Sequence, residues 1–166
     1  MTSRQETVFR WTDPTDTIKA VAREKIHGLS YLQAIVDGRF PTAPAIELAS
    51  ARLTAVASGE ATIRFAPERV HMNAMGLVHG GIVSTVLDST IGYAIISMLE
   101  AGKTFSTLQL NVTFVRPVAP GQNYIAHARV RHGGRRTVVA EANIVAENEG
   151  KEHATANAIG VVLDIP

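Results

Sequence analysis

The sequence contains no cysteine, which excludes disulfide bonds, a thiol nucleophile and a cysteine-based zinc site. This composition suits a reducing compartment. The first sixteen residues also lack an apolar stretch of the length that a secretory signal peptide needs. We therefore expect a cytoplasmic protein.

Long blocks of like charge are absent as well. The 16 Lys and Arg residues and the 15 Asp and Glu residues are mixed along the chain and leave a net charge of +1. Such a distribution gives no electrostatic basis for binding nucleic acid or an anionic membrane. An anionic ligand would have to be bound by local groups.

Several common catalytic motifs are missing. No GxSxG, GxxxxGKS/T, GxGxxG or HExxH segment occurs, so serine hydrolases, P-loop proteins, dinucleotide-binding proteins and zincins are not indicated. The six histidines show no metal-ligand spacing. We expect neither a metal nor an organic cofactor.

A long central helix is predicted within one domain, since 166 residues with 46% hydrophobic content can bury one sizeable core. Between His79 and Glu100 the only charged residue is Asp88. Interrupting glycine, serine and threonine residues, and the lack of basic or aromatic flanks on both sides, argue against a membrane span. A helix that is apolar on nearly all sides is instead enclosed by other structure.

Strands are predicted on both sides of this helix. In Thr104–Val115, Leu108, Leu110, Val112 and Phe114 alternate with Thr107, Gln109, Asn111 and Thr113, which is the period of a strand. Short glycine-containing turns separate the other expected strands. Those strands are Ala51–Ala57, Ala61–Phe65, Asn123–His132, Thr137–Ala146 and His153–Leu163. The sequence thus predicts an α+β fold, with a curved antiparallel sheet around the helix.

The first fifty residues have a different pattern. Asp16 can cap a helix that runs to about Ile26 and ends at Gly28, and Ser30 can cap a second helix that runs to Asp37. Pro41 and Pro44 are expected to break the chain. We therefore predict a helical extension over residues 1–50, packed on a core domain over residues 51–166.

A set of spaced residues resembles a known family. It comprises Asn73, the segment Gly76-Leu-Val-His79-Gly80-Gly81, and Asp88 seven residues later. The similarity continues through Leu108-Gln-Leu-Asn111-Val-Thr-Phe114-Val-Arg116-Pro117 and Gly134-Arg135-Arg136-Thr137. This set resembles the hotdog-fold thioesterases of the phenylacetate-degradation (PaaI-like) branch. The resemblance implies a sheet wrapped around a central helix, pairing of two sheets in a dimer, and hydrolysis of acyl-coenzyme A thioesters.

Hydrogen-bond donors for a thioester carbonyl are predicted at the start of the helix. Gly80 and Gly81 leave their backbone N–H groups accessible there, aided by the positive end of the helix dipole. We expect the Gly80 N–H to polarise the carbonyl and Gly81 to contribute to substrate binding. The family pattern implies that Asn73 and His79 shape this donor site. Alternatively, Gly80 and Gly81 form a tight turn, His79 is a cap and Asn73 is a turn residue.

Asp88 is the predicted general base or nucleophile. Thioester hydrolysis needs such a carboxylate opposite the carbonyl donors. A charge enclosed in an apolar helix also costs several kcal/mol unless it is paired, so a purely structural role is disfavoured. Thr107 matches the position where the family places a hydroxyl beside this acid. It could equally be an ordinary residue on the polar face of its strand.

Arg135 and Arg136 are predicted to contact the phosphates of coenzyme A from a hairpin turn. A solvated turn is the alternative. Arg116 has the same two options, as a phosphate contact or as a cover for the sheet edge.

The helix geometry predicts active sites shared between two chains. Asp88 lies eight residues after Gly80, or about 12 Å at 1.5 Å per residue, whereas a reacting carbonyl must lie about 3 Å from each group. A two-fold dimer with antiparallel central helices brings Asp88 of one chain opposite Gly80 of the other. We expect a homodimer or a homotetramer built from such dimers.

Two other functions fit the same residues. An enoyl-thioester hydratase of this fold also uses Asp and His to position water, but it releases no thiol. An acyl-thioester binding module would keep the pocket without turnover, and the presence of Asp88 argues against it.

Overall fold

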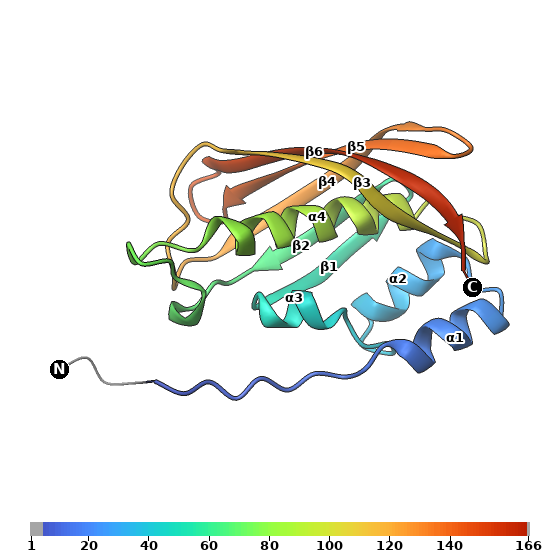
Figure 1. Cartoon of the computed structure of the whole chain (residues 1–166), viewed down its shortest axis with the longest axis horizontal. Coiled ribbons are helices and arrows are strands. Elements are labelled where there is room, and N and C mark those ends of the chain that lie inside the picture. Colours follow the sequence, from blue (N-terminus) through green and yellow to red (C-terminus); the bar gives the residue numbers. More distant parts are fainter. Residues whose placement is uncertain (1–4, 166) are drawn as a thin grey trace.

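The structure, a computed structural model of the chain, describes residues 5–165. One antiparallel sheet of six strands has the order β1-β2-β4-β5-β6-β3. It curves around the long helix α4, which runs from Gly80 to Ile96 and lies against its concave face (Figure 1). The strands are β1 (Ala51–Ala57), β2 (Glu60–Phe65), β3 (Lys103–Phe114), β4 (Tyr124–Gly133), β5 (Thr137–Ala146) and β6 (Glu152–Asp164).

The core lies between α4 and the sheet. On β5, alternate residues are buried, as the sequence pattern predicts for a strand with one face on the core. Val83, Val86, Leu87 and Ile91 of α4 are almost fully buried against this face. The predicted α+β fold, a curved antiparallel sheet around a central helix, is confirmed. No helix among residues 5–165 is long and apolar enough to cross a membrane.

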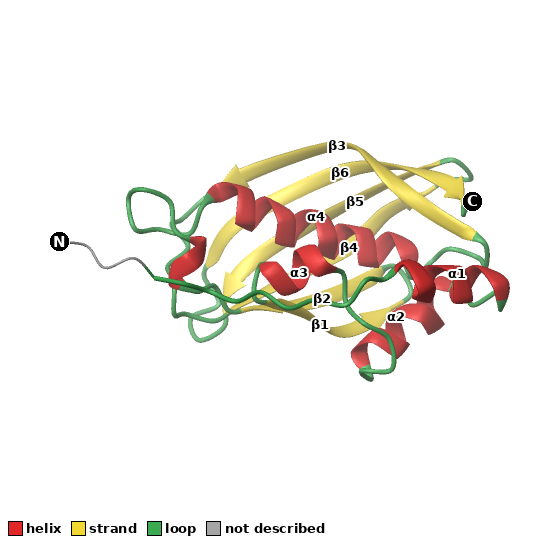
Figure 2. Cartoon of the chain, turned by 60° about the horizontal axis from the view of Figure 1, so that its bottom comes forward, coloured by secondary structure: helices red, strands yellow, loops and turns green. Residues whose placement is uncertain are grey.

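The N-terminal helices lie on the β1 side of α4 (Figure 2). They are α1 (Thr15–Arg23), α2 (Gly28–Val36) and α3 (Pro44–Leu48), and a single 3-10 turn, η1 (Arg69–His71), follows β2. Leu32 of α2 and Ile46 of α3 are fully buried, and both helices contact β1 and α4. At the opposite edge of the sheet, these helices leave β3 uncovered (Figure 2).

Two local predictions for this N-terminal part are wrong. Pro44 does not break the chain but begins α3, because proline fits the first helical position, where no backbone N–H is needed. Gly28 does not end a helix but begins α2. A Cβ there would lie 1.8 Å from the Ile96 carbonyl oxygen, so glycine allows α2 to approach the end of α4.

The alternation predicted for β3 is interrupted by a bulge. Thr107 pairs with Gly160 and Gln109 with Ile159, so Leu108 is an extra residue on β3. The bulge reverses the faces on which residues before and after it lie. Thr107 therefore lies on the same face as Leu110, Val112 and Phe114, toward α4, and not on the opposite face with Asn111 and Thr113.

Candidate active site

The first turn of α4 offers one free backbone donor. His79 is the N-cap residue, and its Nδ1 accepts a hydrogen bond of 2.9 Å from the Gly81 N–H. This bond fixes the start of the helix and occupies the Gly81 donor. Among residues 5–165, no group accepts a hydrogen bond from the Gly80 N–H. Gly80 therefore presents a free donor at the positive end of the helix dipole.

A tight loop before α4 holds Asn73 near this donor. The Asn73 Oδ1 accepts hydrogen bonds from the N–H groups of Met75 (2.9 Å) and Leu77 (3.3 Å). The Asn73 N–H also donates to the Leu77 carbonyl oxygen at 2.7 Å. Among the described residues, hydrogen bonds to the Asn73 side chain use its oxygen. Its NH2 group is therefore available to donate a hydrogen bond to a ligand.

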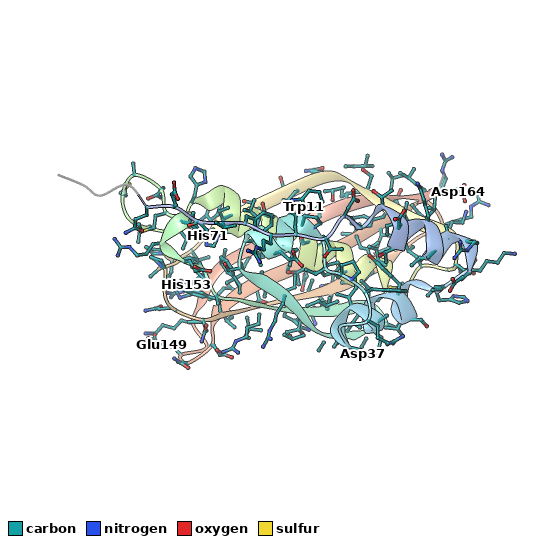
Figure 3. All side chains as sticks on the ribbon, turned by 90° about the horizontal axis from the view of Figure 1, so that it is seen from below. Trp11, Asp37, His71, Glu149, His153 and Asp164 are labelled. Atoms are coloured by element: carbon teal, nitrogen blue, oxygen red, sulfur yellow. The ribbon has the colours of Figure 1, made fainter. Side chains whose placement is uncertain are left out.

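His71 anchors this loop, and the sequence reasoning missed it. Its backbone carbonyl accepts the His79 N–H at 2.8 Å, which closes the loop at its base. Its buried ring accepts the Glu68 N–H on Nδ1, so Nε2 donates to the Leu48 carbonyl oxygen at 2.8 Å. Figure 3 labels His71 at the end of the molecule where η1 lies. Because Leu48 is 23 residues away in sequence, no periodic pattern could have revealed that contact.

Asn73 and Gly80 line one pocket of about 320 Å³. Most of its other walls are apolar and include Val83 of α4 and Phe114 of β3. Arg116 also lines it, and its Nη1 donates to the Glu152 carbonyl oxygen at 2.6 Å. The two predicted donors of one chain are therefore on the wall of the same apolar pocket.

Asp88 lies in the middle of α4, where Thr107 contacts it. The Thr107 Oγ1 donates a hydrogen bond of 2.9 Å to the Asp88 Oδ1. The carboxylate is not fully enclosed in the single chain, contrary to expectation, because Asp88 is only half-buried. Its side of α4 faces β3, which is an edge strand. The β3 bulge is what turns the Thr107 hydroxyl toward this carboxylate.

The donor site and the carboxylate lie at different places along α4. β3 runs antiparallel to α4: Phe105 lies against Gly92, Thr107 contacts Asp88, and Phe114 lies against Gly80. With about 1.5 Å per residue, the eight residues from Gly80 to Asp88 span roughly 12 Å of helix. The structure thus joins Asn73 with Gly80, and Thr107 with Asp88, but does not unite all four around one point in a single chain.

Arg135 and Arg136 lie at the opposite end of the sheet from Gly80. They are exposed in the turn between β4 and β5, and the Arg136 carbonyl accepts a hydrogen bond from the Val162 N–H near the end of β6. Asp164, at that end, lies far from His71 in Figure 3. Within one chain, these arginines are therefore remote from the donor site.

Two tyrosines near α2 have raised pKa values. Burial raises the pKa of Tyr31 to about 12. Burial also raises the pKa of Tyr93, whose hydroxyl lies 3.5 Å from the Thr42 Oγ1. Both hydroxyls stay protonated at neutral pH. No cluster of three or more His, Asp or Glu side chains in residues 5–165 could hold a metal ion.

Comparisons with known proteins agree with this architecture. A family model for the thioesterase superfamily matches residues 75–153. Acyl-coenzyme A thioesterase 13 of Homo sapiens is 25% identical over 99 residues, which are 60% of this chain and 70% of the relative. The residues matched by the family model include Asp88 and Thr107.

Solved structures extend the similarity over most of the chain. A thioesterase family protein from Silicibacter pomeroyi is 32% identical, with a TM-score of 0.71, over 81% of this chain and 99% of that one. A phenylacetic acid degradation-related protein from Ralstonia eutropha JMP134 is 26% identical, with a TM-score of 0.72, over 79% of this chain and 98% of that one. The predicted hotdog fold and PaaI-like family are thereby confirmed. The chain belongs to the thioesterase superfamily and is a thioester hydrolase.

Proposed function

We propose that the protein hydrolyses acyl-coenzyme A thioesters to a free acid and coenzyme A. The observation that carries the proposal is Asp88, an accessible carboxylate oriented by the Thr107 hydroxyl on the open side of the central helix. Its relatives named acyl-coenzyme A thioesterase 13 support the choice of substrate. Hydrolysis needs a base or nucleophile on one side of the carbonyl and donors on the other.

The Gly80 N–H binds the thioester carbonyl oxygen in this mechanism. As the carbonyl carbon becomes tetrahedral, negative charge develops on the oxygen, and the donor and the helix dipole stabilise it. The Asn73 NH2 group is a second hydrogen-bond donor in the same pocket. The His79 ring holds the first turn of α4 in place. Gly81 supports binding through its position in that turn, since its own N–H is occupied by His79.

Asp88 activates the water that attacks the carbonyl carbon. It takes one proton from the water as the new C–O bond forms, and the C–S bond then breaks to release coenzyme A as the thiolate, which is protonated to the thiol. Direct attack by the Asp88 carboxylate would instead form an anhydride that water hydrolyses, with the same products. Thr107 holds the carboxylate in position in either case.

A second copy of the chain completes each site. Within residues 5–165, β3 pairs only with β6, so its other edge is open along a 12-residue strand, with Leu108 66% exposed and Phe114 55% exposed. A long, partly apolar edge of this kind is normally covered. Pairing of β3 with the partner's β3 about a two-fold axis sets the two α4 helices antiparallel and brings Asp88 opposite the partner's donor site.

The same two-fold arrangement gives the arginines a role. Because the helices run antiparallel, the far end of one subunit lies beside the donor end of the other. Arg135 and Arg136 of one chain then approach the coenzyme A phosphates of a substrate held at the other chain's Gly80. Larger assemblies can form from such dimers without altering these sites.

Thiol release from purified protein tests the proposed activity. A panel of short, long and aryl acyl-coenzyme A substrates should yield free coenzyme A and the corresponding acid in equal amounts. An enoyl substrate converted to a hydroxyacyl thioester, with no thiol released, would support the hydratase instead. Tight binding of acyl-coenzyme A without any product would support the binding module.

A further inference from the structure

We propose that Phe114 is a specificity-determining residue that restricts substrates to acyl groups without a branch at the carbon next to the carbonyl. The inference rests on the proposed function, because it places the thioester carbonyl at Gly80. It extends that function by assigning the pocket beside Gly80 to the acyl chain and by naming the side chain that limits its shape.

The Phe114 ring lies against the position that a side chain would occupy at Gly80. A Cβ atom built on Gly80 would lie 3.1 Å from the Cζ of Phe114 and 3.5 Å from the nearer Cε. The absence of a side chain at Gly80 thus allows the ring to lie directly on the first turn of α4. Any carbonyl that accepts the Gly80 N–H must lie about 3 Å from that nitrogen, and so next to this ring.

The pocket suits the acyl chain better than the pantetheine arm. Pantetheine carries two amides and a hydroxyl, which lose free energy when buried without hydrogen-bond partners. The walls offer polar side chains only from Asn73 and Arg116, and the other lining residues are Leu77, Val78, Val83, Val115, Pro117 and Val118, besides Gly80 and Phe114. A volume of about 320 Å³ fits an acyl chain of moderate length.

The Phe114 ring limits the width of the pocket beside the thioester carbonyl and leaves the rest of the pocket open. A methyl branch at carbon 2 would have to share the space between Gly80 and the ring, while a straight chain can continue along Val83. One added methyl group commonly changes specificity by tenfold or more in a close-fitting site, on the order of 1 to 3 kcal/mol. The wild-type enzyme should therefore prefer butyryl-coenzyme A to 2-methylbutyryl-coenzyme A by about tenfold in kcat/KM.

Replacement of Phe114 tests the assignment. Phe114→Ala should reduce that preference about tenfold, with the gain on the branched substrate, and Phe114→Leu should reduce it less. Phe9→Ala is the matched control, because Phe9 is also a partly exposed phenylalanine, 40% exposed, but lies outside this pocket. It should keep the wild-type preference. Light scattering on each variant verifies that the assembly is unchanged, since Phe114 also lies on the edge strand.

A second experiment tests the contact itself. Gly80→Ala should force the ring to move and lower activity on butyryl-coenzyme A. Adding Phe114→Leu should recover part of that loss if the ring causes it. Recovery would support the packing that the inference requires, and a loss equal to that of Gly80→Ala alone would contradict it.

The outcomes separate this inference from the proposed function. An unchanged ratio of branched to linear activity in folded Phe114→Ala and Phe114→Leu would overturn the role of Phe114 while leaving thioester hydrolysis intact. If the Phe114 variants change KM equally for every acyl group, the ring contacts the pantetheine arm. That result would also overturn the role of Phe114 in acyl specificity. Failure of the wild-type protein to release thiol from any substrate would instead refute the proposed function.

Discussion

The first turn of α4 and its middle differ in the groups that they present to a substrate. At the first turn, the free group is a backbone N–H, and the neighbouring side chain of His79 supports the helix. In the middle, the free group is the Asp88 carboxylate, which a strand hydroxyl orients. In the proposed mechanism the two places supply complementary groups for one reaction, but about 12 Å of helix separates them.

The two edges of the sheet differ as well, because one is covered and the other is open. The N-terminal helices lie over β1, on the side of the molecule away from β3. The β3 side, where the carboxylate is half-buried, has no cover from the described chain. If a second subunit completes each site, as proposed above, it must dock on this side. Removing the carboxylate and the donor site in turn tests the comparison.

Loss of the carboxylate should have the largest effect. Asp88→Asn keeps the shape of the side chain and an oxygen for the Thr107 hydroxyl, but it cannot accept a proton from water. We expect kcat to fall by at least about a hundredfold, the scale for a general base, with circular dichroism unchanged. Asp164→Asn is the control, because Asp164 is exposed and forms a surface ion pair with Lys103. Turnover close to wild type in Asp88→Asn would remove the assignment.

Mixing two inactive variants should restore activity. Asp88→Asn subunits retain the donor site, whereas subunits with Asn73→Ala and His79→Ala retain the carboxylate. After exchange at equal concentrations, half of the dimers are mixed and each has one intact site, so about a quarter of wild-type activity should return. Different tags and mass measurement verify that mixed dimers form. If verified mixed dimers are as inactive as their parents, the reaction must be completed within one chain.

The regular parts of the fold could be predicted from the sequence. The strand Thr137–Ala146 has the predicted bounds because its alternation is uninterrupted, and α4 begins at the predicted Gly80. Periodicity could not reveal the extra residue in β3, since Leu108 is apolar and fits the alternation as written. The face on which Thr107 lies was therefore predicted wrongly, although its position beside Asp88 was anticipated from the family resemblance.

Other features depend on contacts between distant segments. His71 joins η1 to the end of α3 through the Leu48 carbonyl, and no local pattern marks such a bond. The enclosure expected for Asp88 followed from an apolar helix, but enclosure also requires enough sheet on every side. Because β3 is the edge of the sheet, the single chain leaves Asp88 partly open.

Removal of the hydroxyl beside Asp88 should have an intermediate effect. Thr107→Val retains the shape of the side chain and deletes the 2.9 Å hydrogen bond to the carboxylate. A hydrogen bond to a charged group contributes about 1.5 to 3 kcal/mol, so kcat/KM should fall by about tenfold or more. Thr113→Val is the matched control, because Thr113 is on the same strand but on the face away from α4. Equal activities of the two variants would show that Asp88 needs no orienting partner.

The smallest expected effect comes from the arginines at the hairpin turn. If Arg135 and Arg136 contact coenzyme A phosphates across the dimer, replacing both with alanine should raise KM for an acyl-coenzyme A by about threefold to tenfold. A truncated acyl-pantetheine thioester has no phosphate and should show no change in KM. The difference should also shrink as salt is raised, because these exposed charges are screened. Arg52→Ala, at an exposed position on β1, should affect neither substrate. Equal increases in KM for both thioesters would show that the turn acts without recognising phosphate, and the far end of the partner would then have no part in binding the nucleotide.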